Sequence, residues 1–566
     1  MRSTTDLLGT LFAKASPGRV ILEIDLDRGV LRAAPENPFE AFRAINAPTL
    51  TGLTEALREA AKDDRVTGLV VHVGTCPLSA AMVDEVGAAI RAFGEHKPTL
   101  AYAETFGELT SGMFPYRLAT AAGSIWLQPS GAVSLGGIHI DMMLLRGGFA
   151  KLGMEPQFGQ RKEYKTAAET YAAEAVSDAN REMSGRLAES LVEETLATIS
   201  ERRGMTVETV RALLDRGPIN ATEALALGLV DSLGYRDDVY DHVRGSWGSD
   251  ATLQYAARYT GSVTAKVMAR LAKRPTIAVV SVHGGIVSGR PGPRSPFGGA
   301  QAGSEVVCEH LRQARLDDDV KAVVLAVDSP GGSYIASDTI RAGVLALKKA
   351  GKPVVASMGD VAASGGYFVA MAATEIVASP STLTGSIGVL AGKIVNQGLY
   401  DKLGLVREDV QTGRLADMFT GNRSFTQEQW DILNAWLDEV YADFTTKAAA
   451  DRSMALDVLE PLARGRVWTG ADAKERRLVD HLGGREVAVE RAAVLAGVDR
   501  DAVAVRPVPL LGLLERLRPA QSSEQLGGLS AGGPTRGAAG LLADISSALG
   551  VEQSGVLTMP YRLRIS

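Results

Sequence analysis

Short apolar runs alternate with amphipathic stretches along much of the chain. Residues Val320–Val327 form a nearly unbroken apolar run, which is typical of a strand covered on both faces of a parallel sheet. Residues Ser337–Lys349 carry apolar side chains at helical spacing, and Lys352–Met358 predicts a second strand. A strand, a helix and a second strand in this order predict right-handed βαβ units and an α/β fold.

The same succession occurs twice, because the chain contains an internal repeat. Residues Ala56–Val73 (ALREAAKDDRVTGLVVHV) match His310–Val327 (HLRQARLDDDVKAVVLAV). Residues Leu229–Arg236 (LVDSLGYR) match Leu478–Arg485 (LVDHLGGR) in the same order. Ordered matches separated by a nearly constant offset of about 250 residues predict two homologous domains.

The repeat sets the predicted domain boundaries. Residues 1–18 form an N-terminal segment, and 19–245 form the first domain. Residues 246–274 connect it to the second domain, residues 275–510. The stretch after Pro519 is rich in Gly, Ser and Ala, so 511–566 is predicted to be a flexible linker and tail.

Two further local features are predicted. Asn180–Arg203 has the pattern of a long polar, amphipathic helix, and Ser246–Asp250 is predicted to be a turn between the two copies.

Composition excludes several classes of protein. The 566 residues include 66 acidic and 60 basic side chains, a net charge of −6, so no basic excess exists to neutralise the phosphates of a nucleic acid. The two cysteines, Cys76 and Cys308, are too few for a disulfide framework or a thiolate zinc site.

Membrane insertion is not predicted from the apolar runs. No segment reaches the roughly 18 to 20 unbroken apolar residues that span a bilayer. Residues Met1–Ser16 also lack the apolar run of a signal peptide. We therefore expect a chain that is neither exported by this route nor threaded through a membrane.

The densest chemical signal lies in the second copy. VDSPGGSYIAS (Val327–Ser337) places Gly331 and Gly332 between a strand and a helix, where backbone N–H groups can point at a negatively charged oxygen. Ser364, followed by Gly365, likewise lies between a strand and an apolar helix, which favours a nucleophilic hydroxyl. The alternative is that Ser364 is a helix N-cap and the glycines form a tight turn.

A nucleophilic serine requires a base, and histidine is poorly supplied. No histidine lies between Ser364 and His481. The first copy has TCPLS (Thr75–Ser79) in place of the glycine turn, but it alone carries Lys162 and Lys165 in GQRKEYKTAAETY. This complementary loss predicts one composite site built from both copies. The alternative is that both lysines are solvated loop residues.

At these residues the chain resembles signal peptide peptidase A, or protease IV, in its long duplicated form with a Ser–Lys dyad. The resemblance extends over roughly Arg19–Val498. It implies that Ser364 is the nucleophile, that Lys165 rather than Lys162 is the general base, and that Ser386 hydrogen-bonds the lysine amine. The motifs that carry it are VDSPGGSYIASDTIR, GKPVVASMGDVAASGGYFVA, ASPSTLTGSIGV, VWTGADAKERRLVDHLGG and EYKTAAETY.

The resemblance also implies a mechanism and a fold. Burial would lower the pKa of Lys165, and the N–H groups of Gly365, Gly332 and Gly331 would hold the oxyanion. No metal or other cofactor is required. The implied fold is a tandem-duplicated superhelix of βαβ domains like those of Clp proteases and crotonases.

Substrates and partners follow from the same resemblance. The implied substrates are cleaved signal peptides and other short hydrophobic peptides, and the implied assembly is a homotetramer. The expected location is the cytoplasmic side, and the chain either docks peripherally on the membrane or degrades peptides in solution. Candidate docking faces are residues 7–12, with Leu7, Leu8, Leu11 and Phe12, and Leu541–Val551.

Two other functions remain open from sequence. A crotonase-type acyl-CoA enzyme would also use paired backbone amides as an oxyanion hole, without needing Ser364 or Lys165. A membrane-associated scaffold whose protease site has decayed is the non-enzymatic alternative.

Overall fold

A computed structural model describes residues 18–32, 47–259, 274–291, 300–508 and 557–558. By their contacts the residues divide into two compact units: unit 1 contains Met1–Ile138 and Leu191–Ala272, and unit 2 contains His139–Ser190 and Lys273–Ile565. The segment 139–190, which lies within the predicted first domain 19–245, thus groups with unit 2. The candidate membrane-docking residues 7–12 and 541–551 lie outside the described residues.

Unit 1 contains a parallel sheet in the order β8-β4-β3-β2-β1-β9. Its apolar layers include α3, α4 and α5 on one face of the sheet and α11 on the other. The strands are β1 (Val20–Asp25), β2 (Val66–His72), β3 (Thr99–Ala103), β4 (Ser124–Leu127), β8 (Ser232–Leu233) and β9 (Thr252–Tyr255), and the helices are α3 (Leu50–Ala61), α4 (Ala80–Gly94), α5 (Met113–Ala119) and α11 (Arg236–Trp247).

Unit 2 contains parallel strands in the corresponding order β20-β16-β15-β13-β10-β21. Strand β17 pairs with the last residues of β15, and β19 pairs antiparallel with β17. The strands are β10 (Thr276–His283), β13 (Val320–Ser329), β15 (Val354–Ala363), β16 (Glu375–Ala378), β17 (Leu383–Gly385), β19 (Val467–Thr469), β20 (His481–Leu482) and β21 (Ala504–Pro507).

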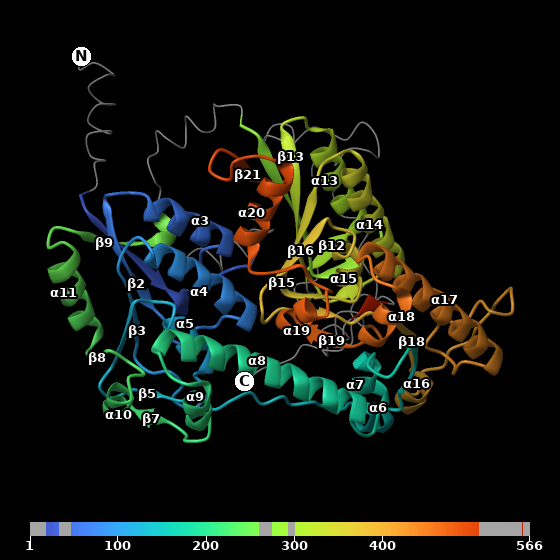
Figure 1. The fold of residues 1–566 in the computed structure, drawn as a ribbon. Coiled ribbons are helices and arrows are strands. Elements are labelled where there is room, and N and C mark those ends of the chain that lie inside the picture. Colours follow the sequence, from blue (N-terminus) through green and yellow to red (C-terminus); the bar gives the residue numbers. More distant parts are fainter. Residues whose placement is uncertain (1–17, 33–46, 260–273, 292–299, 509–556, 559–566) are drawn as a thin grey trace, which may run out of the picture. The chain divides into compact units, whose positions relative to one another are not determined.

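The unit 2 sheet is buried on both faces. Val323 and Leu325 of β13 pack in the layer of α13 (Ser304–Leu316), α14 (Tyr334–Lys349) and α15 (Gly365–Ala370). Ala322 and Val324 face the opposite layer, which includes α20 (Arg485–Ala496). Figure 1 shows α13 and α14 on one side of these strands and α20 on the other. Burial on both faces explains why this strand is an almost unbroken apolar run.

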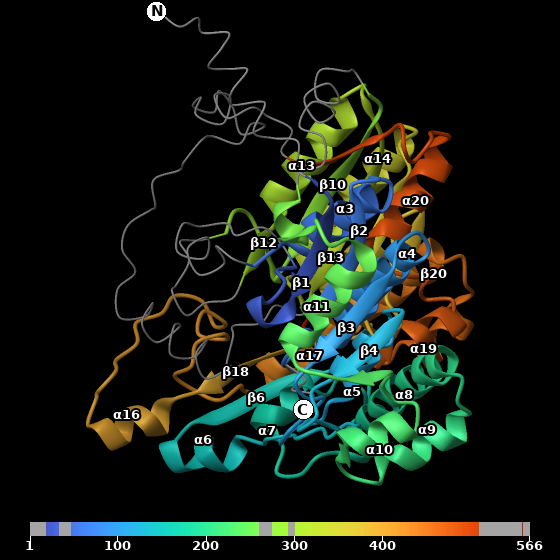
Figure 2. The same cartoon turned by 90° about the vertical axis from the view of Figure 1, so that its left-hand side faces the viewer.

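A separate pair of strands anchors the lysine segment within unit 2. Strand β6 (Glu155–Gln160) runs antiparallel to β18 (Leu390–Val395) over six paired positions, side by side in Figure 2. Helix α17 (Gln427–Asp451) contacts both strands. The chain then continues into α8 (Asp178–Arg203), whose first half belongs to unit 2.

A small third sheet in unit 2 has the order β12-β11-β14-β22. Its strands are β11 (Gly285–Val287), β12 (Gln301–Gly303), β14 (Gly331–Gly332) and β22 (Leu557–Thr558). The remaining elements are β5 (Ala132–Val133), β7 (Ile219–Asn220), α6 (Arg146–Leu152), α7 (Glu169–Ala172), α9 (Val207–Leu214), α10 (Ala221–Ala226), α16 (Gln397–Leu403), α18 (Leu456–Leu459) and α19 (Gly470–Glu475), with short 3₁₀ turns between some of them.

The structure confirms the α/β class and most of the predicted elements. The predicted strands at 320 and 352 are β13 and β15, and the helices predicted at 337 and 180 are α14 and α8. The turn predicted at Ser246–Asp250 is wrong in its first two residues, because α11 continues through Trp247. Gly248, with φ of 147°, ends that helix. Within the described part of the chain, no helix is both long enough and apolar enough to cross a bilayer.

Candidate active site

Ser364 lies at a sharp turn from strand to helix. Strand β15 ends at Ala363 and α15 begins at Gly365, so the predicted junction is confirmed. Ser364 has φ of 55° and ψ of −114°. Its N–H donates to the carbonyl of Gly385 (2.8 Å), and its own carbonyl accepts from the N–H of Phe368 (2.9 Å). A non-glycine residue in this region stores roughly 1–3 kcal/mol of strain, and such strain concentrates at functional sites.

Lys165 brings its amine to this serine from a different part of the sequence. It lies five residues beyond β6, and its side chain is completely buried. Its Nζ lies 2.8 Å from Oγ of Ser364, 3.0 Å from Oγ of Ser386 and 3.2 Å from the Ser386 carbonyl oxygen. All three residues belong to unit 2.

The electrostatics of this contact favour a neutral amine. Burial lowers the pKa of Lys165 well below its ordinary value of 10.5, because the ammonium form would lose its hydration. No nearby carboxylate opposes this effect among the causes of the shift. The lowered pKa increases the neutral fraction of the amine at a given pH, and only the neutral amine can accept a proton from a hydroxyl.

Two glycines fix the position of the lysine, and sequence reasoning missed both. Gly465 has φ of 83°, and a Cβ there would lie 2.5 Å from the backbone N of Lys165. A Cβ on Gly388 would lie 2.7 Å from Cα of Gly465 and 3.2 Å from Cδ of Lys165. The N–H of Tyr164 also donates to the carbonyl of Arg464 (3.2 Å). Gly388 lies in the motif GSIGV and Gly465 in RGRVWTG, but the sequence alone does not show which residues these glycines contact.

Ser386 is held as firmly as Ser364. It follows β17, has φ of 50°, and its N–H donates to the carbonyl of Arg466 (2.6 Å). Its side chain is fully buried. The amine of Lys165 is therefore surrounded by two serine hydroxyls, both on strained backbone.

The predicted glycines lie beside the serine. A Cβ on Gly365 would be 3.1 Å from both Cα of Gly331 and N of Gly332, so the two βα turns are in direct contact. Gly331 and Gly332 have φ of 104° and 151°, conformations that favour glycine. The N–H of Gly331 already donates to Oγ of Ser329 (3.1 Å).

The alternative bases are engaged elsewhere. Lys162 has a side chain that is 41% exposed, and its Nζ lies 3.7 Å from a carboxylate oxygen of Glu460. His283 lies 3.4 Å from Asp328, and His481 lies 3.2 Å from Glu375. The structure thus brings Lys165 to Ser364 and does not bring Lys162 there.

The corresponding turns of unit 1 carry no such arrangement. The internal repeat aligns Ser111-Gly112 with Ser364-Gly365, and the hydroxyl of Ser111 donates to the carbonyl of Leu135 (2.9 Å). Cys76 in the degenerate turn is buried, and this burial raises the pKa of its thiol to about 12, so it is not a reactive thiolate.

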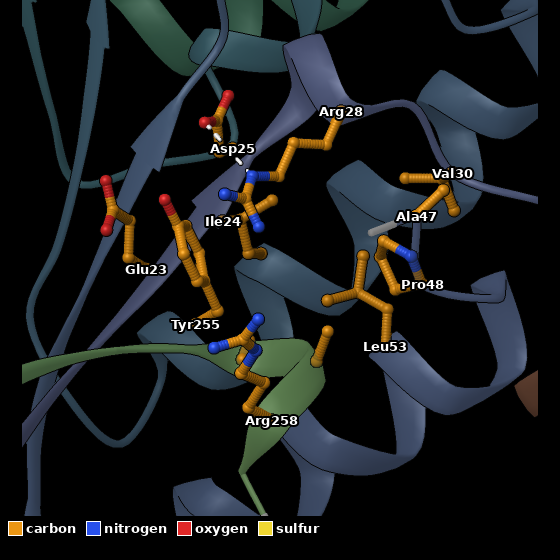
Figure 3. A pocket seen from close by; sticks show the side chains of 12 residues that line it. Glu23, Ile24, Asp25, Arg28, Val30, Ala47, Pro48, Leu53, Tyr255 and Arg258 are labelled. Atoms are coloured by element: carbon orange, nitrogen blue, oxygen red, sulfur yellow. Dashed lines mark ion pairs between the residues drawn. The ribbon is translucent and has the colours of Figure 1, made fainter. Parts of the chain in front are cut away.

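Unit 1 does contain a pocket of about 190 Å³, lined in part by Asp25, Arg28 and Tyr255 (Figure 3). Arg28 lies 3.6 Å from Asp25 and stacks over the ring of Tyr255. None of the predicted site residues lines it.

The same region holds a group with the spacing of metal ligands. Within the described ranges, Asp25, Asp27 and His72 place one ligand atom each within 4.8 Å of one another. However, His72 is bound between Asp25 (3.2 Å) and Glu104 (2.8 Å), and Asp27 accepts from Thr75 (2.8 Å). The group is explained by its own hydrogen bonds.

A parallel α/β sheet that presents a strained, buried serine beside an amine of lowered pKa fits the serine hydrolase class. The family model described as "Peptidase family S49" matches residues 91–247 and 346–499, together more than half of the chain. The chain belongs to Peptidase family S49, and the predicted class of serine-type peptidase is confirmed.

Individual relatives agree with this assignment. The chain is 34% identical over 459 residues to "Protease 4" of Salmonella typhi, covering 79% of this chain and 72% of that one. It is 32% identical over 457 residues to "Serine protease SPPA, chloroplastic" of Arabidopsis thaliana, covering 80% of this chain and 66% of the relative. A solved chain, a mutant of the "1510-N membrane-bound stomatin-specific protease", is 14% identical with a TM-score of 0.27, covering 42% of this chain and 100% of that one; this score carries no argument about the fold.

Proposed function

We propose that this chain is an endopeptidase in which Ser364 is the nucleophile and Lys165 is the general base. The observation that carries the proposal is the 2.8 Å separation between Nζ of Lys165 and Oγ of Ser364. The lowered pKa of the buried amine supports it, because only the neutral amine can take the serine proton.

The reaction begins when Oγ of Ser364 attacks the carbonyl carbon of a peptide bond while its proton passes to Nζ of Lys165. The tetrahedral intermediate collapses as Lys165 returns that proton to the leaving amine, and an acyl-enzyme remains on Ser364. Lys165 then takes a proton from a water molecule as that water attacks the acyl carbon. When this second tetrahedral intermediate collapses, Lys165 returns the proton to Oγ of Ser364 and the acid product leaves. Ser386, 3.0 Å from Nζ, keeps the amine directed at Ser364.

The oxyanion would be held by backbone amides at the two contacting turns. The N–H groups of Gly365 and Gly332 are the preferred donors, because the N–H of Gly331 is occupied by Ser329. Removing one such donor typically costs roughly 3–4 kcal/mol of transition-state stabilisation. The role of Gly331 is then steric, because the turn at Gly365 packs directly against its Cα.

The architecture that we infer is a tandem duplication of a superhelical βαβ domain of the Clp-protease and crotonase type. The corresponding strand orders of the two units support it. In this view the first copy, 19–245, contributes the lysine, and the second copy, 275–510, contributes the serine. The grouping of 139–190 with unit 2 explains how the lysine segment reaches the serine without the rest of its copy.

The substrate class and assembly are also part of the proposal. A relative from Enterococcus faecium named "Putative signal peptide peptidase SppA" is 30% identical over 231 residues. We propose cleaved signal peptides and other short hydrophobic peptides as substrates, a homotetramer as the assembly, and contact with the cytoplasmic side of the membrane.

Labelling with a serine-reactive fluorophosphonate tests the nucleophile and the base together. Attack of Oγ on phosphorus expels fluoride, so we expect a single adduct that peptide mapping locates on Ser364. Ser364→Ala should abolish the adduct, and Lys165→Met should slow its formation by at least about 10³-fold. Lys162→Met is the matched control. Because Lys162 lies outside the site, this variant should be labelled on Ser364 at the rate of the unchanged chain.

The other outcomes separate the remaining functions. Rapid labelling of Lys165→Met would exclude Lys165 as the base. A folded, unchanged chain that takes no label and hydrolyses no peptide would favour the acyl-CoA enzyme or the decayed scaffold. Binding of coenzyme A by that chain would then distinguish these two.

The pH dependence of kcat/KM tests the protonation state of the amine. Because Lys165 must be neutral and burial lowers its pKa, kcat/KM should rise with pH to a midpoint below 10.5 and fall tenfold per pH unit on the acidic side. The measurement uses a peptide without titratable groups in this range. Lys162→Met should retain the midpoint, and a midpoint at the ordinary lysine value would show that the buried amine is not the base.

A further inference from the structure

The glycine strand beside Ser364 has one neighbour on each side. Strand β14 pairs parallel with β11, where Ile286 is opposite Gly332, and the N–H of Ser333 donates to the Ile286 carbonyl (2.8 Å). On its other side β14 pairs antiparallel with β22: Gly331 is opposite Thr558, and Gly332 is opposite Leu557. Strand β22 comes from the C-terminal end of the same chain.

This second side is where an extended peptide would reach the serine. The position of a Cβ on Gly365 lies 3.1 Å from Cα of Gly331 and from N of Gly332, so the turn that carries Ser364 abuts β14. A Cβ on Gly332 would meet the backbone of Ile286, so the β11 side is filled by protein. Peptides commonly bind by adding a strand to an open sheet edge, and here the open edge is the one that β22 takes.

We propose that β22 is the chain's own occupant of the peptide-binding edge, so that the C-terminal segment and external peptides compete for β14. The inference rests on the proposed function for the identity of the competitor. Its structural part, an extended strand held antiparallel to Gly331–Gly332, stands on the pairing itself.

The chemistry of the edge suits such an occupant. Two glycines present no side chains, so recognition relies on main-chain hydrogen bonds that any extended segment can make. An unpaired edge is also a site for unwanted strand addition, which an internal strand prevents. Residues 509–556 join β22 covalently to the described end of unit 2, so this pairing is made within one chain.

Hydrogen exchange tests the occupancy without requiring activity. The full chain would be compared with a chain that ends at Gly555, which removes 556–566, and with a control that lacks 526–536 and keeps β22. Both deletions remove 11 residues. Exchange of peptides covering 329–338 should be faster in the truncated chain and unchanged in the control. Thr558→Pro keeps the full length, removes one amide donor and should also accelerate exchange. Equal exchange in all chains would overturn the proposal.

Steady-state kinetics test the competition. Truncation at Gly555 should lower the apparent KM for a hydrophobic peptide several-fold with kcat unchanged, and a synthetic peptide of residues 551–566 should restore the higher KM. An unchanged KM despite faster exchange would overturn the competition. If no chain hydrolyses the peptide or takes the fluorophosphonate label, the proposed function fails, while the exchange result still decides whether β22 covers β14.

Discussion

Lys165→Met and Ser364→Ala are each expected to lower kcat/KM for a peptide substrate by about 10⁴-fold or more. The reason is that the two side chains form one proton-transfer unit, with their reactive atoms 2.8 Å apart and both residues fully buried. The double variant should be no less active than either single variant, because removing one partner already disables the other. Stopped and continuous assays of all three variants would measure this.

The thermal stability of Lys165→Met provides the control for misfolding, because this variant should lose activity but gain stability. Burial lowers the pKa of Lys165 in the folded chain, whereas in the unfolded chain it stays near 10.5. Between the folded and the unfolded pKa the unfolded chain binds more protons, so the free energy of unfolding rises with pH. At neutral pH the buried lysine is therefore unfavourable, and methionine of similar length should raise the melting temperature. The gain should shrink as the pH approaches 10.5. A melting temperature that falls at neutral pH would contradict the assigned pKa direction.

The site could be predicted from sequence where duplication left an asymmetry. Ser364 has a counterpart in Ser111, but the glycines at 331 and 332 have none, and Lys165 has no lysine counterpart in the second copy. That comparison pointed to Ser364 and to the two lysines Lys162 and Lys165, and the family resemblance then favoured Lys165, whose contact with Ser364 the structure shows. It worked because a nucleophile, its base and a close-packed turn each demand particular residue types.

Other features of the site could not be predicted, because they depend on which segments meet. The pairing of β6 with β18 places 139–190 in unit 2, and no local pattern in either strand specifies this partner. The pairing of β14 with β22 involves only two residues on each side and leaves no periodicity to detect. Gly465 and Gly388 stand in loops where glycine has many explanations, and only the distance to Lys165 identifies their role.

Gly465→Ala is expected to lower kcat by roughly 10²-fold, because the substitution displaces Lys165. An added Cβ would lie 2.5–2.6 Å from N, Cα and Cβ of Lys165, so the lysine backbone must move and its amine must leave the 2.8 Å contact with Ser364. Gly465 is thus a positioning residue. A displaced and more hydrated amine should also regain part of its ordinary pKa, so the midpoint of the pH profile should rise.

Gly497→Ala separates this effect from backbone strain. Gly497 also has positive φ, 65°, at the end of α20, but a Cβ there would meet nothing within 4 Å. Both substitutions place an alanine at positive φ and carry that backbone strain, but only Gly465→Ala adds a clash with the Lys165 backbone, so thermal unfolding of Gly497→Ala measures the strain alone. Only Gly465→Ala should change kcat and shift the pH midpoint. Equal kinetic effects of the two substitutions would assign the loss to general destabilisation, whereas a normal pH profile for Gly465→Ala would show that Lys165 is held by its side-chain contacts alone.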